Sequence, residues 1–180
     1  MSARPLDAGE LVAQARRLAG FDAGRGRPRT VDLRCAISRA YYALFHELTT
    51  RAAQVLVDGE LSRPPSREAI SAARWFSHTD MLTLCQAVLG QKGLRALRSL
   101  LVEAPDDLAR VCETFVTLQS LRHLADCEHS FDVDRRSARS AALSADDAVQ
   151  RLRRLRAGDD ASYVRFLRLA GGAVRIAKDR

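Results

Sequence analysis

One long stretch of helical periodicity constrains the fold of this chain more than any other feature. Between residues 30 and 57, apolar side chains recur every three or four positions, which is the spacing of one face of an α-helix. Thr30 can cap this helix, and we expect it to run to about Val57. No sustained alternation with a period of two occurs anywhere in the chain, so the sequence favours an all-α protein. The residues that set the helical pattern are Leu33, Ile37, Ala40, Tyr41, Leu44 and Leu48.

Further helices are predicted from capping residues, apolar stripes and chain breaks. The first begins at Asp7, where Glu10 three residues later completes a capping box. Glycines and a proline within residues 20–30 mark the loop that follows it. Ala104–Pro105 opens another helix, whose first turn carries two aspartates at the positive end of the helix dipole. The expected ranges are 7–20, 30–57, 66–89 with a break near 77–80, 105 through the apolar stripe that ends at Ala125, 134–157, and a short helix from Asp159.

These ranges describe an all-α bundle of about five helices plus a short C-terminal helix. A chain of 180 residues is long enough for one domain with a substantial core and too short for two. Its 47% hydrophobic and 28% charged residues are typical of a globular protein. We expect the bundle to occupy residues 5–157 and a basic helical extension to occupy residues 158–180.

The positive charge is concentrated near the C-terminus. Residues 1–134 hold 17 basic and 17 acidic side chains, whereas residues 135–180 hold 12 basic and 5 acidic ones, which accounts for the net charge of +7. Such asymmetry favours an anionic partner, with nucleic acid ahead of a membrane surface. Arginine makes up 27 of the 29 basic residues, so biased composition is the alternative explanation. The candidate RNA-binding residues are Arg135, Arg136, Arg151, Arg153, Arg154 and Arg156.

Two polar stripes suggest a site. In LRHLADCEHS, residues 121–130, Arg122 and His129 lie seven positions apart and would share a helix face, with Asp126 between them. In SRAYYALFH, residues 38–46, Arg39 and His46 have the same spacing, with Tyr42 between them. Tyr41 falls on the apolar stripe and is expected in the core. Two helices of one bundle therefore each present an arginine and a histidine.

These blocks resemble bacterial HEPN-domain proteins. The similarity rests on SRAYYALFH, on ARWFSHTDM at residues 73–81, and on FVTLQSLRHLADCEHSF at residues 115–131. HEPN domains are small helical bundles that include metal-independent ribonucleases, toxin components and non-catalytic partners of nucleotidyltransferases. The resemblance covers nearly the whole chain and implies a homodimer, with a separate antitoxin or nucleotidyltransferase-like chain as a further partner.

The resemblance also implies catalytic residues. HEPN nucleases carry an arginine followed by a polar residue and, after four to six intervening positions, a histidine, which Arg122 and His129 match. His129 can move a proton near neutral pH, and the planar fork of Arg122 can hold two phosphate oxygens while the RNA 2′-hydroxyl attacks. The product would be a 2′,3′-cyclic phosphate. The supporting candidates are His123, Asp126, Arg39, Tyr42 and His46.

A non-catalytic role is the alternative. Many relatives with an SRAYYALFH-like block carry Ala-Asp-Tyr after the arginine and lack the histidine, and this chain has Ala125-Asp126-Cys127 there. Arg122 and Asp126 would then be an ordinary ion pair one helical turn apart, and His129 a solvated residue near a helix end. Phe131 stands where relatives controlled by tyrosine modification carry a tyrosine.

Other chemistries are not expected from this sequence. His123 and Cys127 lie one turn apart, but no second pair with metal-ligand spacing is nearby, so we expect neither a metal nor a cofactor. GRGRPR is not a phosphate-binding loop, because it lacks the lysine and the preceding strand. The N-terminal residues lack the apolar core of a signal peptide, and no run approaches the roughly 20 apolar residues of a membrane span. With four widely spaced cysteines, this pattern predicts a cytoplasmic protein with reduced thiols and no membrane association.

Overall fold

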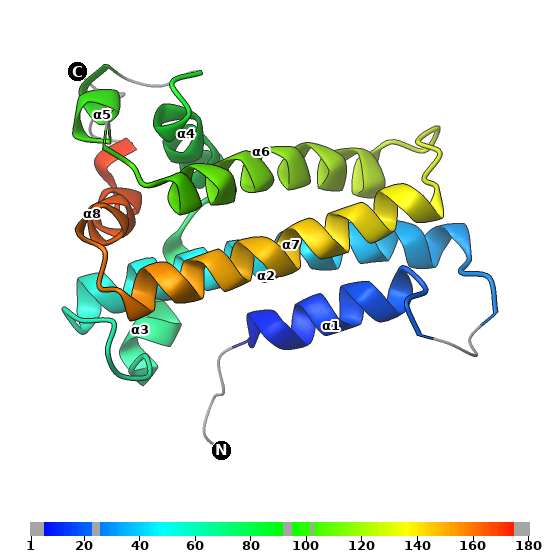
Figure 1. The fold of residues 1–180 in the computed structure, drawn as a ribbon, viewed down its shortest axis with the longest axis horizontal. Helices are drawn as coiled ribbons and strands as arrows, with labels where there is room; N and C mark the ends of the chain where they lie inside the picture. Colours follow the sequence, from blue (N-terminus) through cyan, green and yellow to red (C-terminus); the bar gives the residue numbers. More distant parts are fainter. Residues whose placement is uncertain (1–5, 23–25, 92–94, 102, 175–180) are drawn as a thin grey trace.

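The computed structural model describes residues 6–22, 26–91, 95–101 and 103–174. Within those residues the chain forms eight α-helices and one short 3-10 helix, and no strand. The elements are α1 (Ala8–Leu18), α2 (Thr30–Val57), α3 (Arg67–Ala72), η1 (Ala73–Trp75), α4 (His78–Val88), α5 (Arg95–Leu100), α6 (Asp106–Cys127), α7 (Arg135–Ala157) and α8 (Ala161–Ala170). Figure 1 shows three long helices, α2, α6 and α7, lying along the length of the molecule, with α1 alongside them and α3, α4, α5 and α8 at one end.

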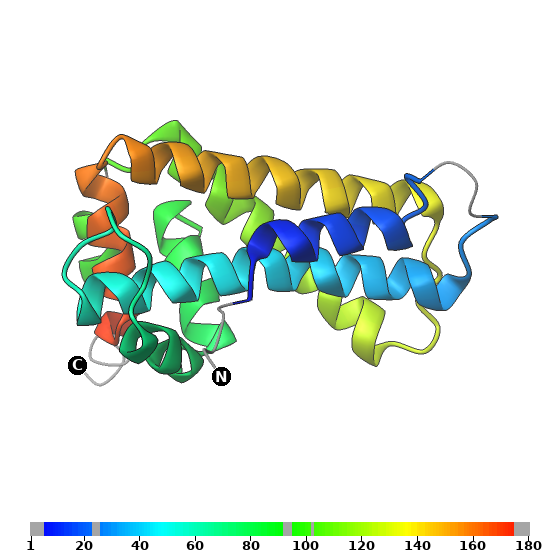
Figure 2. The same cartoon turned by 90° about the horizontal axis from the view of Figure 1, so that it is seen from below.

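Helix α2 is the centre of the bundle. It packs against α1, α6, α7 and α8, and α1 also packs against α7 (Figure 2). Side chains from the first half of α2 contact side chains near the end of α6, so these two helices run antiparallel. The 28 residues of α2 give a helix of about 42 Å, at 1.5 Å per residue. One helix therefore supports both the polar residues of α6 and the short helices at the far end.

Several predicted helix boundaries are confirmed by capping contacts. Asp7 accepts a hydrogen bond of 2.7 Å from the Gly9 amide, and Asp134 accepts one of 2.6 Å from the Ser137 amide. The break expected near residues 77–80 is the start of α4, where Ser77 accepts from the Asp80 amide at 3.0 Å. Thr30 is the first residue of α2 rather than its cap, and Arg29 holds the capping position.

The all-α fold class is confirmed, but the expected helix count is wrong. The helical region predicted for residues 66–89, with its break near 77–80, consists of three elements, α3, η1 and α4, and the chain is extended between η1 and α4 at Phe76 and Ser77. Helix α5 was not predicted. The short last helix is present as α8. It packs against α2 and α4. Residue 5 and residues 175–180, the outer ends of the predicted domains, lie outside the described residues.

The core consists of large aromatic side chains set among small alanines. Tyr41, Phe115, Tyr163 and Phe166 have no exposed surface, as expected for Tyr41 from its place on the apolar stripe. Alanines let the helix backbones approach closely, so that these rings fill the remaining space. The alanines of α2 and α7 that have no exposed surface are Ala36, Ala40, Ala43, Ala52, Ala53, Ala138, Ala142, Ala145 and Ala148.

Replacing Tyr163 with phenylalanine is expected to stabilise the protein by about 1 kcal/mol. The Tyr163 hydroxyl is buried and has no hydrogen-bond partner within the described residues, so its removal relieves a desolvation cost while the ring stays in place. Urea unfolding would measure the change. Tyr41→Phe is the matched control and should destabilise instead, since the Tyr41 hydroxyl is hydrogen-bonded to His78. Equal losses in both variants would contradict the prediction.

No helix among the described residues is long and apolar enough to cross a membrane.

Candidate functional site

Arg122 lies at the centre of a polar cluster between α2 and α6. Its Nη2 donates a hydrogen bond of 3.0 Å to the hydroxyl of Tyr42 on α2. Its Nε lies 2.7 Å from Asp126 Oδ2, an ion pair one turn apart in which the N–H is not aligned for a hydrogen bond. About 29% of the Arg122 side chain is exposed, so the guanidinium is largely enclosed by its partners.

Two tyrosine rings complete the surroundings of this guanidinium. Its central carbon lies 5.5 Å from the ring centre of Tyr42 and 5.8 Å from that of Tyr41, both within cation–π range. Burial opposes the charge on Arg122, but Tyr42 and Asp126 outweigh it and leave the pKa of Arg122 raised. The arginine therefore stays charged while most of its surface faces groups of the same chain.

Helix α2 also fixes the end of α6. Ser38 donates a hydrogen bond to Asp126 Oδ1, so that carboxylate contacts both Arg122 and α2. Arg34, one turn earlier, donates to the carbonyl oxygens of Glu128 and Phe131. These contacts satisfy carbonyl groups beyond the last turn of α6. They hold the turn that carries His129 against the start of α2.

His78 and His46 border the cluster on its other side. His78 Nδ1 lies 2.6 Å from the Tyr41 hydroxyl, and the His78 ring stacks on Phe45 with centroids 3.9 Å apart. The His46 ring stacks on Tyr42 at 5.8 Å. Burial lowers the pKa of His46, and burial together with Arg122 and His46 lowers the pKa of His78. Both rings are therefore neutral at pH 7.

Comparisons with known proteins yield no relative. No family model, no curated protein and no solved structure matches the chain.

The predicted helical stripe from Arg122 to His129 is wrong. Helix α6 ends at Cys127, and Glu128 adopts an extended conformation that turns the chain away. His129 lies in the exposed turn that follows, so the seven-residue spacing does not place it on the same helix face. His123 and Arg39 are exposed beside the cluster, whereas Asp126, Tyr42 and Arg122 are brought together within it.

His78 is part of the cluster but was not among the predicted site residues. A helix N-terminus was expected near this residue, but its contact with Tyr41 depends on how α4 packs against α2, which periodicity does not specify. The position of Arg122 could have been predicted. It follows Phe115 by seven residues and Leu118 by four, so it lies in line with the buried stripe of α6.

The arginines of α7 differ in their surroundings. Arg151 and Arg154 both contact Asp107 at the start of α6, at 2.6 and 3.1 Å, and Arg151 also pairs with Asp147. Arg135 donates to the carbonyl oxygen of Gly20. These three predicted RNA-binding residues therefore join parts of the bundle. The other three, Arg136, Arg153 and Arg156, have no ion-pair partner within the described residues.

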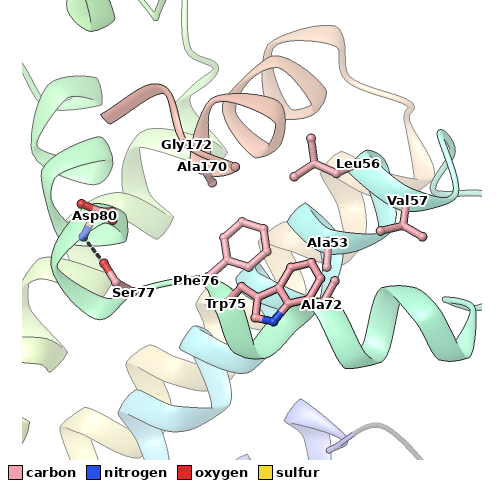
Figure 3. Close-up of a pocket in the computed structure, with 11 residues that line it drawn as sticks. Ala53, Leu56, Val57, Ala72, Trp75, Phe76, Ser77, Asp80, Ala170 and Gly172 are labelled. Carbon is pink, nitrogen blue, oxygen red and sulfur yellow. Dashed lines mark hydrogen bonds between the residues drawn. The ribbon is translucent and has the colours of Figure 1, made fainter. Parts of the chain in front are cut away.

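An apolar hollow of about 250 Å³ lies at the end of the bundle that carries the short helices. Figure 3 shows Trp75 and Phe76 in it, below Leu56 of α2 and the chain after α8. Trp75 is 71% exposed and Leu56 50% exposed, which is unusual for large apolar side chains. None of the charged residues of the α2–α6 cluster lines this hollow. The carboxylate of Asp80 lies at its edge.

No three histidine, cysteine, aspartate or glutamate side chains gather into a metal-binding group in the part of the chain that the structure describes. His123 and Cys127, the pair with helical ligand spacing, are both exposed near the end of α6.

Proposed function

We propose that this chain is a HEPN-type module that binds RNA as a homodimer and does not cleave it. The observation that carries the proposal is that the Arg122 guanidinium already contacts groups of its own chain. Its guanidinium is held by Asp126 and Tyr42 and lies beside two tyrosine rings. A ribonuclease of the expected kind needs this fork free to hold phosphate oxygens.

The charge beside Arg122 supports the same conclusion. The carboxylate of Asp126 is 33% exposed, so its charge would repel an incoming phosphate. His129 is in an exposed turn whose backbone is tied to Arg34. His129 would have to accept a proton from a 2′-hydroxyl whose neighbouring phosphate Arg122 is not free to bind.

RNA binding is proposed from the distribution of charge. The chain carries a net charge of +7, and the pairing of Arg151 and Arg154 with Asp107 leaves several other arginines of α7 and α8 facing solvent. A surplus of unpaired guanidinium groups attracts nucleic acid through its phosphates. This property does not require Arg122 or His129.

The proposed dimer uses the face beside the cluster. Tyr42 and His46 are half-buried there, with Arg39 and His123 exposed around them. A two-fold axis would bury each face against its copy. A separate antitoxin or nucleotidyltransferase-like chain and a cytoplasmic location remain predictions from the HEPN resemblance and from the reduced thiols.

Metal-independent RNA cleavage is the second candidate, and one observation favours it. The lowered pKa values of His46 and His78 leave two neutral imidazoles near Arg122, and a neutral imidazole can accept a proton from a 2′-hydroxyl. If the chain does cleave RNA, these rings are proton acceptors to be compared with His129.

We expect the purified protein to have the mass of two chains by light scattering and to bind RNA in EDTA without shortening it. Labelled RNA incubated with the dimer would be resolved by length, and its ends analysed. Cleavage to 2′,3′-cyclic ends that is lost in His129→Ala would overturn the proposal in favour of the predicted catalytic pair. Cleavage lost in His46→Ala but kept in His129→Ala would overturn it in favour of the α2 histidine.

A further inference from the structure

The end of α7, helix α8 and the loop after α2 lie at the end of the bundle opposite the turn between α6 and α7 (Figure 1). These segments form a basic groove. It is a hollow of about 940 Å³ between the end of α7, helix α8 and the loop after α2. Three arginines line it: Arg156 from the last turn of α7, and Arg165 and Arg168 from α8. None of the three forms an ion pair with a carboxylate in the part of the chain that the structure describes.

The charge of the groove remains positive after its carboxylates are considered. Glu60 lines it, but Glu60 accepts a hydrogen bond from Ser62 and lies 3.4 Å from the Nε of Arg63. Asp159 is the other acidic residue of the lining. Arg165 donates one N–H to the carbonyl of Leu100 at 3.3 Å, which leaves most of its donors unused.

Helical geometry separates these arginines from the ones that hold the bundle together. Arg151 and Arg154 are three residues apart and face Asp107 of α6. Arg156 lies two residues beyond Arg154, so its side chain points about 160° away around the helix axis. One basic segment of α7 therefore has a structural face and an open face.

We propose that the groove formed by Arg156, Arg165 and Arg168 binds the phosphodiester backbone of single-stranded nucleic acid. This inference rests on the proposed RNA-binding function and assigns it a place. A flexible polyanion can enter a concave groove and contact the several guanidinium groups inside it, whereas a flat bilayer would contact only the rim of the groove. Guanidinium forks match phosphate oxygens, and binding releases the counterions of each phosphate.

The lining also indicates how the nucleic acid is read. Among the residues that the structure describes, no aromatic ring lines the groove, so bases have nothing to stack on there, and Val55, Leu61 and Val164 make part of its lining apolar. Recognition through the backbone should therefore be independent of sequence. RNA and DNA strands share this phosphate chemistry, and only a 2′-hydroxyl contact would separate them.

Titration of labelled single-stranded RNA, and of DNA of the same sequence, into the full-length protein over a range of salt concentrations tests the inference. The test variant replaces Arg156, Arg165 and Arg168 with glutamine. We expect its RNA affinity to fall at least about tenfold at low salt. We expect its log–log salt slope to fall by about 2, since each phosphate contact in single strands contributes about 0.7. The triple lysine variant should retain most of the affinity, because it keeps the charges.

A triple variant outside the groove is the matched control. Arg17, Arg27 and Arg74 are exposed and do not line the groove, and replacing them with glutamine removes the same charge. Equal losses in the two glutamine variants would overturn the inference, and so would unchanged binding in the groove variant. Should the groove variant fail to fold, Arg168→Gln alone decides, because that side chain is exposed. A wild-type protein that binds no nucleic acid would instead refute the proposed function.

Discussion

Arg122→Ala is expected to lower the free energy of unfolding by about 2 kcal/mol. The substitution leaves Asp126 without its cation and Tyr42 without its donor, and it removes the group that packs beside the Tyr41 ring. Breaking a fully buried ion pair costs about 3–5 kcal/mol, and breaking an exposed one less than about 1. Arg122 and Asp126 are 29% and 33% exposed, so the expected cost lies between these limits.

Urea unfolding of the variant and of Arg39→Ala would measure this cost. Arg39 is exposed on α2, one turn before Tyr42, and has no ion pair within the described residues. Its loss should therefore change stability by less than about 0.5 kcal/mol. In a double-mutant cycle, Arg122→Ala and Asp126→Ala should be strongly non-additive. Additive losses, or a cost for Arg122 no larger than that for Arg39, would show that the guanidinium contributes little to the fold.

This cost limits what activity measurements on Arg122 can mean. Viewed as a helix-surface residue, Arg122 could be removed without damage to the fold, and a loss of RNA cleavage would then report on chemistry. With the guanidinium between α2 and α6, the same loss could follow from partial unfolding. His129 is exposed on a turn beyond the helix, so its replacement is the cleaner test of catalysis.

Local sequence features predicted the longest helices well. The start of α7 at Asp134, the break before α4 and the full extent of α2 follow from capping side chains and helical spacing, which act within a few residues. Helix α5 was missed because its six residues bury little apolar surface, with Leu97 buried but Leu100 47% exposed. A short helix of this kind depends on its neighbours more than on its own pattern.

The site was predicted only in part, since its contacts join residues far apart in the chain. The sequence suggested that Tyr42 and Arg122 share a face, and they are hydrogen-bonded. It could not show that Asp107 would neutralise Arg151 and Arg154 and leave Arg156 open, because that depends on the rotation of α7 against α6. Counting charges along the sequence gives the surplus but not its location.

His78→Ala is expected to destabilise the protein by about 2 kcal/mol at pH 7. Tyr41 has no exposed surface, and its hydroxyl would lose the partner that lies 2.6 Å away. An unsatisfied buried hydroxyl costs about 1–3 kcal/mol, and the stacked contact with Phe45 is lost as well. Partial exposure of His78 lets water replace some of this contact, so we expect a value near the middle of that range.

The same variant should change the pH dependence of stability. The fold lowers the pKa of His78, through burial and through the nearby Arg122 and His46, so the unfolded chain binds a proton more readily. The unfolding free energy of the wild-type protein should therefore fall as the pH drops from about 6.5, the ordinary histidine pKa, towards the lower folded-state pKa. Carboxylates with lowered pKa values, such as Asp107, contribute only below about pH 4.

Urea unfolding between pH 7.5 and 5 would separate these contributions. His78→Ala should show a smaller loss of stability on acidification than the wild-type protein, and the remainder should come largely from His46, whose pKa is lowered in the same direction. His123→Ala is the matched control for the loss of an imidazole, because that histidine is exposed on α6 outside the stacked rings. A His78→Ala profile parallel to that of the wild-type protein would mean that His78 accepts a proton in the fold as easily as in water. Burial and the nearby charge of Arg122 make protonation of His78 unfavourable in the fold. We therefore expect the unfolding free energies of the two proteins to converge as the pH falls.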